Sequence, residues 1–181
     1  MRKLLLILAL FAGAPFAVGN NNGVGLWLSN YGWGFDLKHF NTPSNVWDIY
    51  LGGGLGFSDR GWASIGLDAG YYWLINNAIK ADASMGKFPV HYGPNAGFGF
   101  WTDGDRNDRN RNNHLVIAPN FAVGISWFPH TSFKWDMSLE LFPGLRIYHN
   151  SIENSSSTKW DSETKLGLGM DARLLVHVYI F

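Results

Sequence analysis

Apolar and polar residues alternate along most of this chain. Between residues 165 and 180 every even-numbered position is apolar, from Leu166 to Ile180, whereas the odd positions include Asp171, Arg173 and His177. Successive side chains of a β-strand point to opposite faces, so a repeat of two residues indicates a strand. This segment therefore predicts a strand with one apolar and one polar face.

The same alternation occurs in seven earlier segments. Turn-forming residues separate them, as at 29–32, where the sequence is Ser-Asn-Tyr-Gly. No segment shows a helical repeat strong enough to compete with these strands. The pattern predicts an all-β protein of eight antiparallel strands. Before 165–180, the expected strands span 23–29, 32–40, 45–57, 61–75, 87–101, 113–128 and 132–148.

Glycine placement indicates which face lies inside. The polar face holds many glycines, among them Gly66, Gly70 and Gly124. Glycine weakens a strand that faces water, whereas the narrow interior of an eight-stranded barrel favours small residues. The apolar face holds large aromatic residues near the strand ends, as lipid-facing surfaces do. We therefore predict an eight-stranded antiparallel up-and-down transmembrane β-barrel with its polar face inside. The tryptophans of the apolar face are Trp33, Trp47, Trp62, Trp73, Trp127 and Trp135.

The first residues have the pattern of a secretory signal peptide. Arg2 and Lys3 precede an apolar run that begins at Leu4, and the small residues of 17–19 provide a cleavage site. We expect residues 1–19 to be removed, which leaves 20–181 as the barrel. Export and a transmembrane barrel together predict the outer membrane of a Gram-negative-type bacterium.

Composition narrows the class of protein further. Aromatic residues make up 16% of the chain and charged residues 15%, against roughly 25% charged in soluble domains. So many aromatic residues exclude a disordered chain. The 14 basic and 14 acidic residues balance, which argues against binding to nucleic acid. The absence of cysteine excludes disulfides and cysteine-based zinc clusters.

Polar segments between the strands predict the connections. If the N-terminus is periplasmic, the connections alternate between the two sides of the membrane. Expected outer connections are 30–31, 58–61, 102–113 and 149–162, and expected periplasmic ones are 41–45, 76–86 and 129–131. The two longest polar connections then lie outside, as is usual for such barrels.

The inward-facing row gathers six acids, four bases and two histidines. Unpaired buried charge is costly, so we expect a paired network that fills a narrow lumen. A path for ions or protons is the alternative. The twelve residues are Asp36, Lys38, Asp48, Asp68, His91, Lys134, Asp136, Glu140, Arg146, Asp171, Arg173 and His177.

Metal and cofactor motifs are weak in this sequence. The run from Asp103 to Asp108 begins like a calcium-binding loop, but it lacks glycine at the sixth position and has His114 at the twelfth, where glutamate is required. The six histidines show no paired ligand spacing. We expect neither a metal nor a cofactor.

These features resemble the small eight-stranded outer-membrane barrels of the OmpX and OmpA-domain size class. Segments 88–93 and 139–143 also resemble a group of outer-membrane barrels that have no assigned activity. In the class, the terminal aromatic residue faces lipid, whereas Phe181 here shares the parity of Asp171. A bulge near Leu174-Leu175 would restore the lipid-facing position. The resemblance implies a monomer among outer-membrane lipids and lipopolysaccharide, with a C-terminal strand that the barrel-assembly machinery recognises.

A second, local resemblance concerns residues 146–151, Arg-Ile-Tyr-His-Asn-Ser, followed by Glu163. This run is similar to the R-x-x-H-x-S motif of PagL-type lipid A deacylases. The resemblance implies Ser151 as nucleophile, His149 as base and Glu163 as the group that orients the imidazole. A polar outer loop that happens to contain these residues is the other interpretation.

The resemblance to small outer-membrane barrels implies a non-enzymatic role, either in envelope structure or in surface interactions through segments 102–113 and 149–163. A lipid A 3-O-deacylase is the first alternative, and a narrow channel for ions or small solutes is the second.

Overall fold

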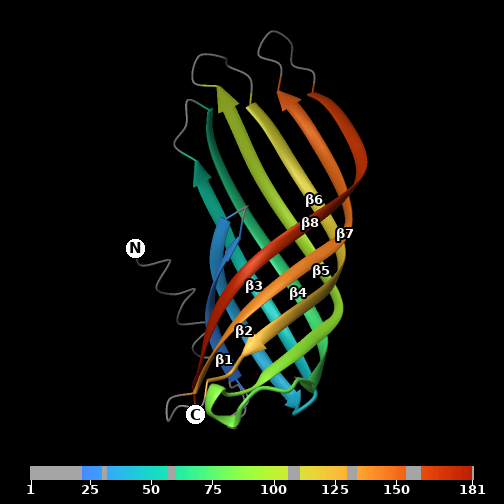
Figure 1. The fold of residues 1–181 in the computed structure, drawn as a ribbon. Helices are drawn as coiled ribbons and strands as arrows, with labels where there is room; N and C mark the ends of the chain where they lie inside the picture. Colours follow the sequence, from blue (N-terminus) through green and yellow to red (C-terminus); the bar gives the residue numbers. More distant parts are fainter. Residues whose placement is uncertain are drawn as a thin grey trace.

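The computed structural model describes residues 22–29, 32–56, 60–105, 111–129, 134–153 and 160–180. Within these ranges eight strands pair antiparallel, each with the next along the chain, and β1 also pairs with β8, so the sheet closes into a barrel (Figure 1). The strands are β1 (Asn22–Ser29), β2 (Gly32–Thr42), β3 (Asn45–Gly56), β4 (Arg60–Ile79), β5 (Phe88–Asp105), β6 (Arg111–Trp127), β7 (Trp135–Glu153) and β8 (Trp160–Ile180). The predicted all-β, antiparallel, up-and-down topology is confirmed. The expected signal peptide lies outside the described residues.

The strands are staggered around the barrel. A row of directly paired residues that starts at Leu26 in β1 reaches Leu166 in β8, yet Leu26 itself pairs with Val176. One circuit therefore advances by ten residues along β8. With a rise of about 3.3 Å per residue and about 4.8 Å between strands, this stagger tilts the strands by roughly 40° from the barrel axis. The row consists of Leu26, Phe35, Leu51, Leu67, Phe98, Ile117, Ile147 and Leu166.

The two faces of the sheet differ sharply in chemistry. Large apolar side chains point outward and are exposed. The exposed fraction is 57% for Leu26 and 71% for Leu166, for example. Charged side chains point inward, and Asp48, Asp136 and Glu140 have no exposed surface. The glycines of the polar face also lie inward, and they leave room for larger neighbours. Gly25, for example, lies against the ring of His177.

Outward-facing aromatic residues contact one another across several strands. Trp47 of β3 lies 4.9 Å from Tyr71 of β4, measured between ring centroids, and Trp73 lies 5.8 Å from Tyr92 of β5. Tyr92 continues the row to Phe121 of β6. The sequence predicted aromatic residues on this face. The side chain of Trp62 lies outside the described set.

The strands run further than the alternation predicted. β5 extends to Asp105 and β6 begins at Arg111, so most of the predicted 102–113 loop is strand. In the same way, β7 extends to Glu153 and β8 begins at Trp160, where a loop over 149–162 was expected. Those predictions were wrong because a strand with polar residues on both faces has the composition of a loop. Backbone pairing, which composition does not reveal, continues to Glu153↔Trp160.

The long strands project from one end of the barrel. We call the end that contains Asn22 and Ile180, which pair, the near end, and the opposite end the far end. The pairing of β1 with β8 stops at Ser29↔Arg173, so within the described residues β8 from Trp160 to Ala172 pairs with β7 alone. Figure 1 shows β4 to β8 rising beyond β1 and β2 at the far end.

A short segment connects β4 to β5 at the near end. β4 extends to Ile79, and a 3-10 turn, η1 (Ala83–Met85), follows where the sequence predicted a turn over 76–86. The Ser84 hydroxyl and backbone N–H both donate to Asp82, at 2.7 and 2.8 Å. These two hydrogen bonds stabilise the carboxylate and hold the pKa of Asp82 below its usual value.

β8 contains no bulge in its described part. Its pairing with β7 runs without a shift from Glu153↔Trp160 to Trp135↔Val178, and Leu175 points into the barrel with no exposed surface. The bulge considered at Leu174-Leu175 is therefore absent. Phe181 lies outside the described residues.

Candidate functional site in the barrel interior

Most of the predicted inward row lies inside the barrel. Ten of its twelve residues are buried and Asp68 is half-buried. Lys134 differs because it is exposed. It precedes the first residue of β7, so the alternation of the strand does not reach it. Its backbone carbonyl accepts a hydrogen bond from the N–H of Tyr179 at 3.0 Å.

Five buried residues lie close to the near end of the barrel. We call them the near-end cluster: Asp36, Lys38, Asp48, Asp136 and His177. The Lys38 ammonium lies 3.6 Å from Asp48 Oδ2 and 3.7 Å from Asp136 Oδ2. The His177 ring lies between two carboxylates. Its Nδ1 is 2.5 Å from Asp136 Oδ1, and its Nε2 contacts Asp36 Oδ2.

Strand register brings the near-end cluster together. Lys38 of β2 pairs directly with Asp48 of β3, and Asp136 of β7 pairs directly with His177 of β8. β1 separates the two pairs, and its inward residue at this level is Gly25, which pairs with both Asp36 and His177. Because glycine has no side chain, the groups of β2 and β8 meet across β1.

A second group is centred on Glu140. Its Oε1 lies 2.9 Å from His91 Nε2, and its Oε2 accepts a hydrogen bond from the Tyr50 hydroxyl at 2.7 Å. On the other side of the imidazole, His91 Nδ1 lies 3.4 Å from Ser126 Oγ, which is itself 2.7 Å from Ser138 Oγ.

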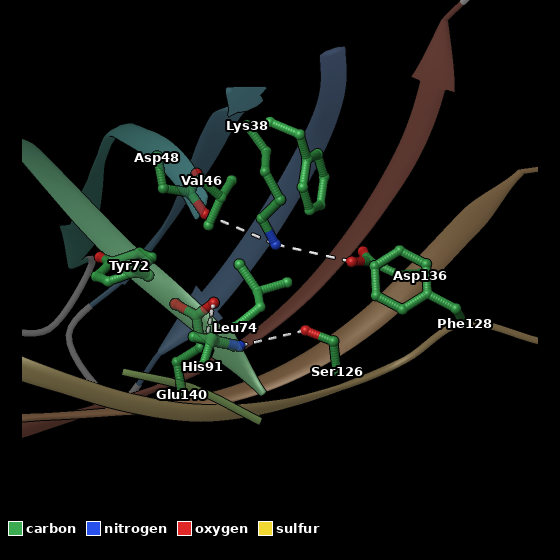
Figure 2. A pocket seen from close by; sticks show the side chains of 11 residues that line it. Lys38, Val46, Asp48, Tyr72, Leu74, His91, Ser126, Phe128, Asp136 and Glu140 are labelled. Carbon is green, nitrogen blue, oxygen red and sulfur yellow. Dashed lines mark hydrogen bonds and ion pairs between the residues drawn. The ribbon is translucent and has the colours of Figure 1, made fainter. Parts of the chain in front are cut away.

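The order Ser126, His91, Glu140 is that of a hydrolytic triad, but its surroundings do not suit a substrate. All three side chains are buried. The cavity beside them measures about 10 Å³, which is room for about one water molecule. Figure 2 shows it enclosed by Lys38, Tyr72 and Phe128 among others. The arrangement can hold a proton within a hydrogen-bonded network, but it leaves no space for an acyl group.

A third group of interior contacts is centred on Arg173. Its guanidinium contacts Asp68 at 2.5 Å and Asp171 at 2.7 Å. The guanidinium carbon also lies over three aromatic rings, at 4.4 Å from the centroid of Phe142, 4.8 Å from that of Tyr50 and 5.0 Å from that of Trp27. Such stacking is favourable for a cation that is largely removed from water.

A chain of neutral polar groups links these levels. Tyr50 OH lies 3.4 Å from Tyr72 OH, which accepts a hydrogen bond from the Asn95 amide at 3.2 Å. Asn120 donates to Asn95 at 3.2 Å and accepts from Arg146. Side chains therefore occupy the interior from the near-end cluster to Arg146.

The alternation pattern did not identify the tyrosine and asparagine side chains of this network. Tyr50, Tyr72, Tyr179, Asn95 and Asn120 all lie on the inward parity of their strands. That parity was the available signal, but tyrosine counts as apolar in an alternation pattern. Tyr179, for example, donates to Asp136 Oδ2 at 2.9 Å and belongs to the near-end network.

The three residues of the deacylase resemblance do not come together. His149 and Ser151 share the outward face of β7, and His149 Nδ1 lies 3.0 Å from the hydroxyl of its cross-strand partner Thr164. Glu163 pairs with Asn150, which places it on the opposite face of the sheet, and it forms an ion pair with Lys165 at 2.8 Å. The arrangement therefore lacks the contact that would orient the imidazole.

No helix within the described residues has the length and apolar character required to cross a membrane. Comparison with family models, with curated proteins and with solved structures finds no match to this chain.

Proposed function

We propose that this chain is an outer-membrane β-barrel protein with a filled interior, whose role is structural or adhesive rather than catalytic. The observation that carries the proposal is the outward row from Leu26 to Leu166, which encircles the whole barrel and is apolar at all eight positions. A barrel in water would expose its polar face and bury the apolar one. Here the charged residues of the inward face, such as Asp48, Glu140 and Arg173, are buried instead.

The closed sheet supports placement in lipid. Each backbone N–H and C=O in a bilayer needs a partner within the protein, and a closed barrel supplies one at each strand. The outward aromatic contacts from Trp47 to Phe121 correspond to the aromatic girdle at a membrane surface. About 9–11 tilted residues cross the hydrocarbon layer, so β4 to β8, of 17 to 21 residues, project beyond it.

The interior supports a non-conducting barrel. Arg173, Glu140 and the near-end cluster contact side chains from opposite walls, and the cavity between them admits about one water. A conducting pore needs a continuous water path, which this packing interrupts. The projecting far end, with the exposed residues Glu163 and Lys165, is then the surface through which we expect the protein to contact partners outside the cell.

Fractionation and conductance test the proposal together. We expect the full chain in the outer-membrane fraction, with heat-modifiable migration on gels. In planar bilayers, many insertions of the folded protein should give no steady single-channel steps, whereas a known porin in the same bilayers conducts. A chain found in the soluble periplasmic fraction would overturn the membrane assignment. Stable conductance steps would overturn the filled interior.

A further inference from the structure

Three members of the near-end cluster have the arrangement of metal ligands. One oxygen each from Asp36 and Asp48 and one ring nitrogen of His177 all lie within 4.8 Å of one another. All three side chains are buried, and they come from three strands, β2, β3 and β8. One ion could therefore contact all three donors, and it would link β2 and β3 to β8.

Three of the four carboxylate oxygens of Asp36 and Asp48 lack a hydrogen-bond donor, and the fourth, Asp36 Oδ2, contacts His177 Nε2. Both oxygens of Asp48 and Oδ1 of Asp36 are buried without a hydrogen-bond partner. The closest cation to Asp48, the Lys38 ammonium, lies 3.6 Å away, beyond the usual length of a hydrogen bond. Buried carboxylates are expected to be hydrogen-bonded, paired or bound to a metal, and these oxygens, of which only Asp48 Oδ2 is paired with Lys38, are available as metal ligands.

His177 has the carboxylate support that a histidine ligand requires. Its Nδ1 is 2.5 Å from Asp136 Oδ1, and its Nε2 contacts Asp36 Oδ2, so a bound ion would replace this direct contact between two of its ligands. Asp136 in turn accepts a hydrogen bond from Tyr179 at 2.9 Å. A carboxylate that accepts the second ring N–H is the usual support for a histidine ligand, because it fixes the ring and leaves the other nitrogen free to bind.

Acidic side chains are concentrated at this point of the interior. Four buried carboxylates, those of Asp36, Asp48, Asp136 and Glu140, lie near the ammonium of Lys38 and the rings of His91 and His177. A cation bound between Asp36 and Asp48 would therefore lie among several carboxylates.

We propose that Asp36, Asp48 and His177 bind one divalent transition-metal ion inside the barrel. Two carboxylates and an imidazole favour Zn²⁺ or a similar ion over Ca²⁺ and Mg²⁺, which prefer oxygen ligands alone. The ion would tie β2 and β3 to β8 across β1. This inference does not depend on the location of the barrel in the cell.

Zn²⁺ and Co²⁺ test the site on the folded full chain in detergent. After exposure to excess Zn²⁺ and dialysis, the wild type is expected to retain one Zn²⁺ per chain. Bound Co²⁺ should show visible absorption bands with the intensity of a low-coordinate site. Asp48→Asn and His177→Gln should each weaken Zn²⁺ binding by at least about tenfold and remove the Co²⁺ bands. Glu163→Gln, which alters an exposed carboxylate, is the matched control and should behave like the wild type.

A second variant tests the site if Asp48→Asn fails to fold. Lys38→Met removes the ammonium that a metal ion would have to displace or tolerate, so it should bind Zn²⁺ about tenfold more tightly and unfold at higher temperature only when Zn²⁺ is present. Three results would overturn the proposal: a wild type that retains no metal, metal that persists in both ligand variants, or Lys38→Met without tighter binding.

Discussion

Arg173 contacts two carboxylates and three aromatic rings in the barrel interior. It is the cation for both Asp68 and Asp171, and it stacks against Phe142, Tyr50 and Trp27. Removing one member of a buried ion pair costs more than the pair contributes, because the remaining charge stays buried without a partner.

We therefore expect Arg173→Met to lower the free energy of unfolding by about 3–5 kcal/mol, measured by urea titration of the barrel folded in lipid vesicles. Lys165→Met is the control. It breaks the exposed pair with Glu163, in which both side chains are about 60% exposed, and should cost less than about 1 kcal/mol. Equal losses in the two variants would contradict the central role assigned to Arg173.

The His177 ring occupies the space that a side chain at position 25 would fill. A Cβ added at Gly25 would lie 2.5 Å from His177 Cδ2 and 2.8 Å from the carbonyl oxygen of Val176. The ring is held by Asp36 and Asp136, so it cannot move aside without breaking those contacts.

Gly25→Ala should consequently destabilise the barrel by about 1–3 kcal/mol in the same urea titration. Gly66→Ala is the matched control, because its Cβ would meet only the Phe98 carbonyl oxygen at 3.5 Å, an ordinary contact. That substitution should leave stability within about 1 kcal/mol of the wild type. If Gly25→Ala were as stable as Gly66→Ala, the close packing around His177 would be wrong.

For a single strand, the sequence predicts which side chains face inward better than it predicts the residues at which the strand begins and ends. Alternation is a local property, so the inward parity of Asp36, Glu140 and Arg173 can be read directly from the chain. Strand ends depend on backbone pairing, and β7 and β8 remain paired through polar residues that look like a loop. At the far end the predicted strands were therefore too short: β5 and β7 run past their predicted ends, and β6 and β8 begin before their predicted starts.

Which inward residues contact one another was also beyond the sequence. Lys38 meets Asp136 and His177 because of the register in which β1 pairs with β8, and no local pattern records that register. A different register there would keep every parity and the direct pairs Lys38–Asp48 and Asp136–His177, but these two pairs would no longer meet. Ten of the twelve residues predicted to face inward are buried, but which of them contact one another could not be predicted from the sequence.

The register between β7 and β8 also separates the residues of the deacylase resemblance. Asn150 rather than His149 lies opposite Glu163, so the structure does not bring the Glu163 carboxylate to the imidazole. When the protein is expressed in an outer membrane, we expect lipid A mass spectra to be identical for the wild type, Ser151→Ala and an empty control. A loss of one acyl chain that disappears in Ser151→Ala would restore the deacylase interpretation.

For the whole molecule, the arrangement of polarity is the reverse of that in a barrel in water. Burial of charge is tolerated because Arg173, Lys38 and the histidines lie among carboxylates, and the outward face gains from contact with an apolar medium. In water this face would expose a continuous apolar surface far larger than that of ordinary soluble proteins. Membrane placement is therefore the central claim.

Site-directed labelling tests that claim most directly, and the absence of native cysteine makes it straightforward. A fluorophore at Leu67→Cys, in the outward row, is compared with one at Ser84→Cys, in the exposed near-end turn, after the protein is folded into vesicles. The account predicts that quenchers carried on lipid tails quench the label at position 67, and that aqueous iodide quenches the label at position 84. Iodide quenching at position 67, with no effect of the lipid quencher, would contradict it.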